Sequence, residues 1–214
     1  MKVEIWSDIV CPFCYIGKRR FEKALASFSQ KDKVEVVYRS FQLDPDMKPE
    51  KGVSVNQYLA NRKGIPPEQA KEMNEYVTSM AKAEELLFDF DKAVITNTLQ
   101  AHRLLQLAKA HGLQPATKEK LMSAYFTEGK DVGDENVLLE LGKEVGLPVE
   151  EIKALFANES YMEDVELDQY MAQQLRVQGV PFFVFNNKYA VSGAQAQSVF
   201  AEVLEKAAEQ ELAG

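Results

Sequence analysis

The chain has 214 residues, of which 46% are hydrophobic and 27% charged, an ordinary globular composition that excludes disordered and fibrous proteins. Its 25 Lys and Arg residues against 33 Asp and Glu residues give a net charge of −8 at pH 7. We therefore expect no nucleic-acid partner, because phosphate binding needs clustered cations. No apolar run is long enough to span a bilayer, so we expect no membrane partner either.

The predicted elements begin with a strand at residues 2–7, where Val3 and Ile5 alternate with polar neighbours. This start, MKVEIWSDIV, carries several charges and no apolar leader, so we expect a cytoplasmic protein. Apolar residues then recur at helical spacing to about residue 29, and residues 34–41 form a second β-rich run. The β-α-β order is typical of the start of a parallel α/β sheet.

Residues 54–177 have an almost wholly helical pattern, punctuated by turn residues. Proline and capping side chains indicate where these helices begin, at Pro66-Pro67, Thr96 or Asn97, Thr117, Asp134 and Pro148. The last helix of this block is expected over residues 162–177, ending before Gly179.

The β pattern returns at residues 182–186 and 189–192, with an expected turn at Asn187-Lys188, and an amphipathic helix over 196–212 follows. The order is therefore β-α-β, a block of helices, then β-β-α. We predict two domains: residues 1–44 with 178–214 form the α/β domain, and residues 45–177 form an inserted helical subdomain.

The two cysteines, Cys11 and Cys14, lie in a Cys-Pro-Phe-Cys sequence between a predicted strand and a predicted helix. This spacing places Cys11 at the helix N-cap, Pro12 at the first helical position and Cys14 inside the first turn. The exposed amides and the positive end of the helix dipole favour a thiolate on Cys11. Cys11 is thus the expected nucleophile, and Cys14 the thiol that resolves a mixed disulfide.

Two other interpretations of the cysteine pair are an inert buried pair and half of a zinc site. Zinc normally takes four ligands. The histidines, His102 and His111, lie nine positions apart on one predicted helix and so point to opposite faces. We therefore expect no metal, and a redox pair is the favoured interpretation.

Val180-Pro181 comes just before the second β-rich region. Proline cannot donate to a strand ladder, so it belongs at a strand start. One interpretation is a trans proline that ends a loop. The other is a cis proline whose neighbouring backbone faces the cysteines and binds an extended substrate. Cis bonds before proline are uncommon, so the residues by themselves favour the trans form.

Taken together, the stretches SDIVCPFCYIGKRRFEKAL, VVYRSFQLDP, NTLQAHRLLQLA and QGVPFFVFNNKYAVSGAQ resemble the FrnE-type subgroup of DsbA-like proteins, which have a thioredoxin-like fold with a large α-helical insertion. The resemblance implies a thiol–disulfide oxidoreductase or isomerase in which Cys11 attacks, Cys14 resolves and the Val180–Pro181 bond is cis. It implies disulfide-containing proteins or small-molecule thiols as substrates, and no cofactor. A reductase or glutathione is the expected redox partner.

Phe13 stands where periplasmic DsbA has a histidine and cannot add positive charge to Cys11, so we expect a milder oxidant. A related branch, the kappa-class glutathione transferases and 2-hydroxychromene-2-carboxylate isomerases, generally carries Ser or Thr at the first cysteine position. The presence of Cys11 favours dithiol exchange over a glutathione-dependent isomerase or transferase. A chaperone-like peptide-binding module with a groove beside Pro181 is a further alternative.

We have separate expectations for four further residues. Phe13 is expected to be partly exposed and to contact an apolar substrate, whereas Trp6 belongs to the core. His102 either lines a groove above Cys11 or is a buried structural histidine. Asn97 is expected to cap a helix.

Overall fold

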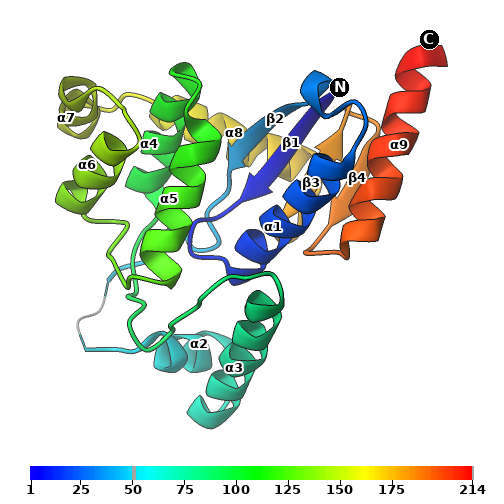
Figure 1. Ribbon diagram of the computed structural model, residues 1–214. Helices are drawn as coiled ribbons and strands as arrows, with labels where there is room; N and C mark the ends of the chain where they lie inside the picture. The colour runs from blue at the N-terminus through cyan, green and yellow to red at the C-terminus, as the bar shows by residue number, and fades with distance from the viewer. Residues whose placement is uncertain (50–51, 214) are drawn as a thin grey trace. The chain divides into compact units, whose positions relative to one another are not determined.

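The computed structural model describes residues 1–49 and 52–213, and its contacts divide the chain into two compact units (Figure 1). Unit 1 comprises Met1–Leu43 with Glu166–Gly214, and unit 2 comprises Asp44–Val165. The division into residues 1–44 with 178–214 and residues 45–177 stays a prediction of the domain organisation.

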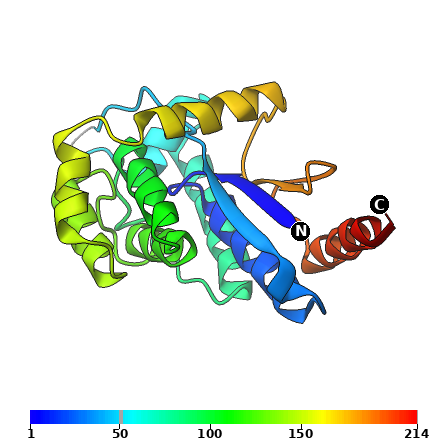
Figure 2. The same cartoon turned by 90° about the horizontal axis from the view of Figure 1, so that it is seen from above.

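The sheet of unit 1 has four strands in the order β2-β1-β3-β4. β1 and β2 are parallel, and β1 and β3, like β3 and β4, are antiparallel. The expected order of elements is confirmed, because α1 joins the first two strands and the last two are followed by α9 (Figure 2). The bounds are β1 Lys2–Ser7, α1 Pro12–Ser27, β2 Glu35–Ser40, β3 Phe182–Phe185, β4 Tyr189–Ser192 and α9 Gln197–Ala213.

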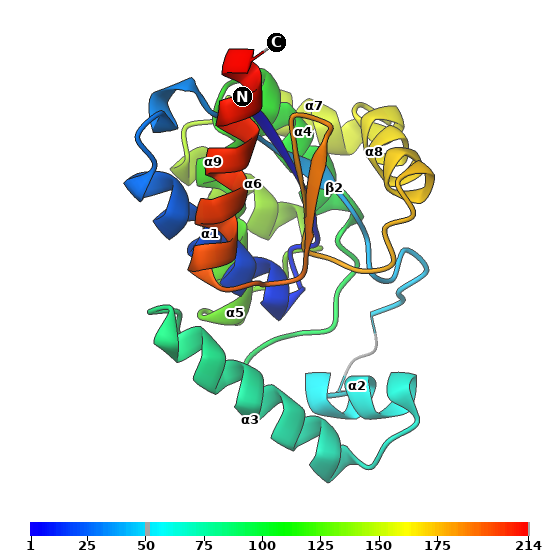
Figure 3. The ribbon, with the colours of Figure 1, turned by 90° about the vertical axis from the view of Figure 1, so that its right-hand side faces the viewer.

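One face of this sheet is covered by α1 and α9 (Figure 3). Phe21 of α1 lies at the centre of that core, with its ring centroid 5.6 Å from Phe183 and 5.8 Å from Phe200. Val3 and Ile5 of β1 point into the same core, because alternate residues of a strand share a face. Burial of these large apolar side chains holds α1 against the sheet.

The other face of the sheet carries a buried ion network. Arg39 of β2 donates to Glu4 of β1 over 2.8 Å and to Asp168 over 2.9 Å. Asp168 belongs to α8 (Met162–Gln174), and its second carboxylate oxygen accepts the Ser40 amide at 2.8 Å. The Trp6 indole donates to the Asp168 carbonyl over 2.8 Å, and Trp6 is buried as predicted. The network therefore fastens residues 166–174 to the two parallel strands.

Electrostatics in this network favours the charged forms. Burial opposes ionisation of Glu4, but the hydrogen bond and charge of Arg39 outweigh it, so the pKa of Glu4 lies below its usual value. Burial also opposes the charge on Arg39, yet its contacts with Glu4 and Asp168 raise the pKa of Arg39. The charged forms of Glu4 and Arg39 are thus stabilised by their ion-pair partners.

Unit 2 is helical in the described residues. Its helices are α2 Val55–Lys63, α3 Pro67–Ala83, α4 Leu99–Ala110, α5 Gln114–Phe126, α6 Glu135–Glu144, α7 Val149–Ala157 and the start of α8. Asp134 caps α6 as predicted, accepting the Asn136 and Val137 amides at 2.8 and 3.2 Å. None of the helices in the described part of the chain has both the length and the apolar character needed to cross a membrane.

Three sequence-based boundaries are wrong by a few residues. α5 begins at Gln114, so Thr117 lies inside the helix, where its hydroxyl donates to the Leu113 carbonyl. α8 ends at Gln174, because Arg176 takes a left-handed backbone with φ 54°. The hairpin turn centres on Asn186 and Asn187, at φ 49° and 54°, and not on Asn187-Lys188. Asparagine tolerates this conformation, which a tight hairpin turn requires.

Replacing Arg39 with Met should lower the free energy of unfolding by about 3–5 kcal/mol at pH 7, because two buried carboxylates lose the cation they share and Glu4 keeps only Lys2, at 3.3 Å. Glu4 has a lowered pKa in the folded protein, so its contribution is present above its unfolded pKa of about 4.3 and is lost below it. The difference between wild type and variant should therefore shrink as the pH falls from 7 to below 4.

Urea unfolding at several pH values measures this difference. Lys206→Met is the control, because Lys206 forms an exposed ion pair with Glu202 on α9, and its loss should leave the midpoint unchanged. A pH-independent difference for Arg39→Met would contradict the role assigned to the two carboxylates.

Candidate active site

The two cysteines lie where β1 passes into α1. Cys11 is the N-cap residue of α1, with an extended backbone at φ −88° and ψ 112°, and Pro12 occupies the first turn, as the sequence predicts. The amides of Cys14 and Tyr15 donate to the Cys11 carbonyl at 3.0 and 3.4 Å. Cys11 and Cys14 are both thiols and both buried, at 4% and 1% exposure. Phe13 between them is 40% exposed, as expected, and so presents an apolar surface beside the cysteines.

The Val180–Pro181 segment meets the first cysteine. The Cys11 Sγ donates to the Val180 carbonyl oxygen over 3.6 Å, a contact between residues 169 positions apart. The Val180–Pro181 bond is cis and not trans, as the family resemblance implies. Substrate binding at this dipeptide stays a prediction. A thiol and a backbone carbonyl next to the start of β3 thus share one site.

Gly17 is a residue of this site that sequence reasoning missed. A Cβ atom at this position would lie 2.9 Å from Pro181 Cγ and 3.4 Å from the Cα and Cβ of Ala194. Glycine inside a helix costs about 1 kcal/mol relative to alanine, so its presence in α1 was a weak signal of a close approach. Here it lets α1 pass directly beneath Pro181.

Asp8 is a second residue that the sequence did not reveal. Its side chain is buried, with 1% exposure, and one carboxylate oxygen accepts the Ile9 amide at 2.8 Å. The other accepts the Leu43 amide at 2.8 Å. Asp8 therefore ties the loop that leads to Cys11 to the chain beyond β2.

The remaining sequence candidates lie in unit 2. His102 is fully buried in α4. Its predicted part in substrate binding stays a prediction. The N-cap residue of α4 is Thr98, so the cap expected at Asn97 is wrong by one position. The Asn97 carboxamide oxygen still accepts the Leu99 amide at 2.9 Å. Arg103 is buried and donates to the carbonyls of Leu155, Asn158 and Ser160 near the end of α7. Its cation therefore stabilises the C-terminal end of a helix.

Among the described residues, no three or more His, Cys, Asp or Glu side chains group as a metal site requires. His111 instead contacts Glu151, with Nε2 2.8 Å from Oε2.

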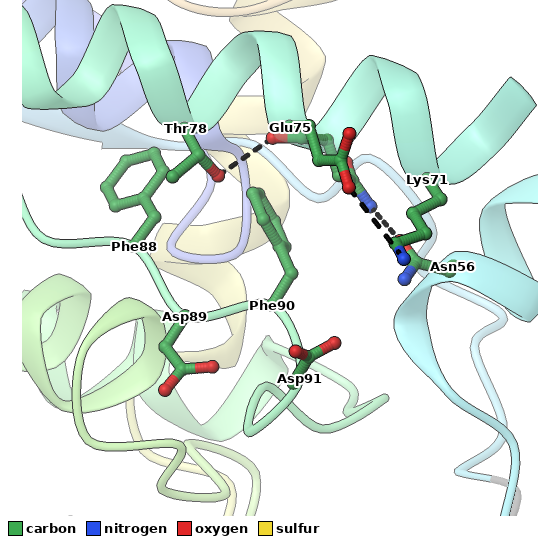
Figure 4. A pocket seen from close by; sticks show the side chains of 9 residues that line it. Asn56, Lys71, Glu75, Thr78, Phe88, Asp89, Phe90 and Asp91 are labelled. Carbon is green, nitrogen blue, oxygen red and sulfur yellow. Dashed lines mark hydrogen bonds and ion pairs between the residues drawn. The ribbon is translucent and has the colours of Figure 1, made fainter. Parts of the chain in front are cut away.

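A separate hollow of about 180 Å³ lies within unit 2, between α2, α3 and the segment that follows α3 (Figure 4). Phe88 and Phe90 point toward α3, whereas the carboxylates of Asp89 and Asp91 point away from it. The Asn74 side chain donates to Asn56 over 2.7 Å. The residues that line the hollow include no cysteine, so it offers no thiol chemistry of its own.

Comparison with known proteins agrees with this geometry. A family model described as the DSBA-like thioredoxin domain matches residues 2–205. The crystal structure of a probable DsbA oxidoreductase from Streptomyces coelicolor is 42% identical, with a TM-score of 0.91 over 97% of this chain and 89% of that one. The uncharacterized protein YwbO of Bacillus subtilis is 27% identical over 94% of each chain.

A more distant structure shares the fold. The cytosolic disulfide reductase DsbM from Pseudomonas aeruginosa, solved with GSH, is 18% identical, with a TM-score of 0.69 over 96% of this chain and 98% of that one. These matches confirm the thioredoxin-like α/β fold with its helical insertion. None of them names the FrnE-type subgroup, which stays a prediction.

Gly17→Ala should destabilise the protein by about 1–3 kcal/mol, because the added methyl group overpacks the contact with Pro181 and Ala194. Urea unfolding measures the change. Gly179→Ala is a matched control on the other side of Val180, since a Cβ there would meet nothing within 4 Å. Equal stability of Gly17→Ala and the control would contradict the close packing described here.

Proposed function

Because the chain belongs to the DSBA-like thioredoxin family, we propose that it is a redox enzyme that catalyses thiol–disulfide exchange through Cys11 and Cys14. The observation that carries the proposal is the position of Cys11, at the N-cap of α1 with its Sγ 3.6 Å from the Val180 carbonyl. The helix N-terminus favours the thiolate that attacks sulfur. The neighbouring backbone offers hydrogen-bonding groups to an extended substrate.

In the proposed reaction, the Cys11 thiolate attacks one sulfur of a substrate disulfide. A mixed disulfide forms, and the other substrate sulfur leaves as a thiolate. The Cys14 sulfur, after losing its proton, then attacks Cys11, so the second substrate thiol is released and a Cys11–Cys14 disulfide remains. The substrate gains two electrons and the cysteine pair loses them.

Turnover in this direction needs a reductant for the Cys11–Cys14 disulfide. We propose glutathione or a dithiol reductase, and two glutathione molecules would supply the two electrons as they form glutathione disulfide. Phe13 carries no charge, so the thiolate of Cys11 gains less stabilisation than a cationic neighbour would give. This supports a reduction potential below the roughly −120 mV of DsbA, on the reducing side.

The proposed substrates are disulfide-containing proteins or small-molecule disulfides, held by Val180, Pro181 and Phe13. Phe13 is 40% exposed while its cysteine neighbours are buried, which supports contact with an apolar substrate residue. Two cysteine sulfurs support dithiol exchange over the glutathione-dependent isomerase or transferase reaction.

Cys11→Ser should abolish insulin reduction with dithiothreitol as the electron source, because a serine hydroxyl is a protonated, hard nucleophile. Cys14→Ser should differ in kind and accumulate mixed disulfides, because no second thiol remains to resolve them. Turbidity of reduced insulin and mass spectrometry of trapped adducts measure the two effects.

Activity of Cys11→Ser equal to wild type would reject the dithiol mechanism and favour the glutathione-dependent reactions. Suppression of aggregation by a variant lacking both cysteines would instead support the chaperone-like alternative.

Phe13→His should raise the reduction potential by about 30 mV or more, a tenfold change in the equilibrium constant of the two-electron couple. The reason is that an imidazolium stabilises a neighbouring thiolate. The shift should be larger at pH 6 than at pH 8, because a histidine has an unperturbed pKa of about 6.5. Equilibration with glutathione buffers measures it, and Phe13→Gln is the neutral control. A shift of the same size in Phe13→Gln would contradict the electrostatic cause.

A further inference from the structure

We propose that Arg20 is a positioning residue, which holds the loop between β4 and α9 and thereby sets how Val180 and Pro181 meet Cys11. The inference rests on the thiol–disulfide exchange proposed above. It concerns a side chain outside the Cys-Pro-Phe-Cys sequence, on a later turn of the same helix.

The first step is a hydrogen bond from α1 to the loop. Arg20 Nη1 donates to the Ala194 carbonyl oxygen over 2.7 Å. A guanidinium N–H that donates to a carbonyl makes a charge-assisted bond, which is shorter and stronger than a neutral one. Arg20 therefore fixes Ala194 to the helix that also carries Cys11.

The second step joins the loop to the proline. Gly193, the residue before Ala194, donates its amide to the Pro181 carbonyl over 2.8 Å. Pro181 and Ala194 also crowd the same glycine, because a Cβ atom on Gly17 would lie 2.9 Å from one and 3.4 Å from the other. The loop and the proline are thus linked by a hydrogen bond, and both pack against Gly17. A shift of Ala194 is therefore passed on to Pro181.

The third step reaches the thiol. Val180 directly precedes Pro181, and its carbonyl accepts from Cys11 Sγ at 3.6 Å. In the proposed reaction the backbone here aligns an extended substrate with the attacking sulfur. A misplacement of about 1 Å is enough to cost on the order of 100-fold in rate when it spoils such an alignment. Arg20 therefore governs alignment of a polypeptide disulfide without touching it.

The test compares a disulfide-bonded peptide with hydroxyethyl disulfide, which is too small to pair with the backbone at Val180. Arg20→Met should lower kcat/KM for the peptide about tenfold, mainly through kcat, and change kcat/KM for the small disulfide less than twofold. Arg20→Lys should recover part of the loss, because its ammonium keeps a cationic N–H donor. Arg19→Met is the control and should match wild type, since Arg19 instead lies 5.7 Å from the Tyr15 ring and 3.7 Å from Glu22.

Two outcomes would overturn the proposal. One is equal peptide kinetics in wild type and Arg20→Met. The other is an equal loss on both substrates, which indicates only a general structural role. If wild type exchanges neither disulfide, the proposed function fails, and hydrogen exchange of the Gly193 amide then decides about Arg20. Faster exchange at Gly193 in Arg20→Met than in Arg19→Met supports the positioning role, and unchanged exchange overturns it.

Discussion

The parallel pairing of β1 with β2 is the constraint from which the arrangement of unit 1 follows. A parallel neighbour cannot be reached by a tight turn, so the chain must cross back over the sheet, and α1 makes that crossing. The helix consequently begins at the edge of the sheet where β1 ends, and Cys11 is its N-cap residue. β3 runs antiparallel to β1 with Trp6 opposite Phe182, so the start of β3 lies beside the end of β1. Cys11 and Val180 meet for this reason.

The two faces of the sheet stabilise that arrangement by different means. The face toward α1 and α9 is held by aromatic packing around Phe21. The opposite face carries Glu4 and Arg39 on neighbouring strands, and Asp168 lies over both. A shift of one residue in β1 would turn Glu4 into the aromatic core, where it would lose its cation. The apolar core and the ion network therefore specify the same register.

Local signals in the sequence were sufficient for most elements and for the placement of the cysteines. The strand periodicity, the Pro12 signal and the Asp134 cap each depend on residues a few positions apart, and each agrees with the structure. Backbone conformation at single residues was harder to predict from the sequence. The left-handed conformation of Arg176 ends α8 at Gln174, although the helical pattern of apolar residues continues to residue 177.

Contacts between distant segments were beyond such reasoning. Gly17 matters because Pro181 and Ala194 lie over it, and Asp8 because Leu43 donates to it. Neither partner lies within the same element, so no spacing in the sequence indicates the pair. The cis form of the Val180–Pro181 bond came only from the family resemblance, since the residues by themselves favoured the trans form.

The distance along the chain between the two halves of the site has a consequence for biosynthesis. Cys11 leaves the ribosome early, whereas its contact Val180 follows 169 residues later. At about 5–20 residues per second, roughly 8–34 s pass before the segment that covers the thiol has been made. During that interval β1 also lacks its antiparallel neighbour β3, so the nascent chain carries an uncovered thiol next to an unpaired strand edge. The Cys11 thiol is therefore more open to oxidation on the nascent chain than in the folded protein, where it is 4% exposed.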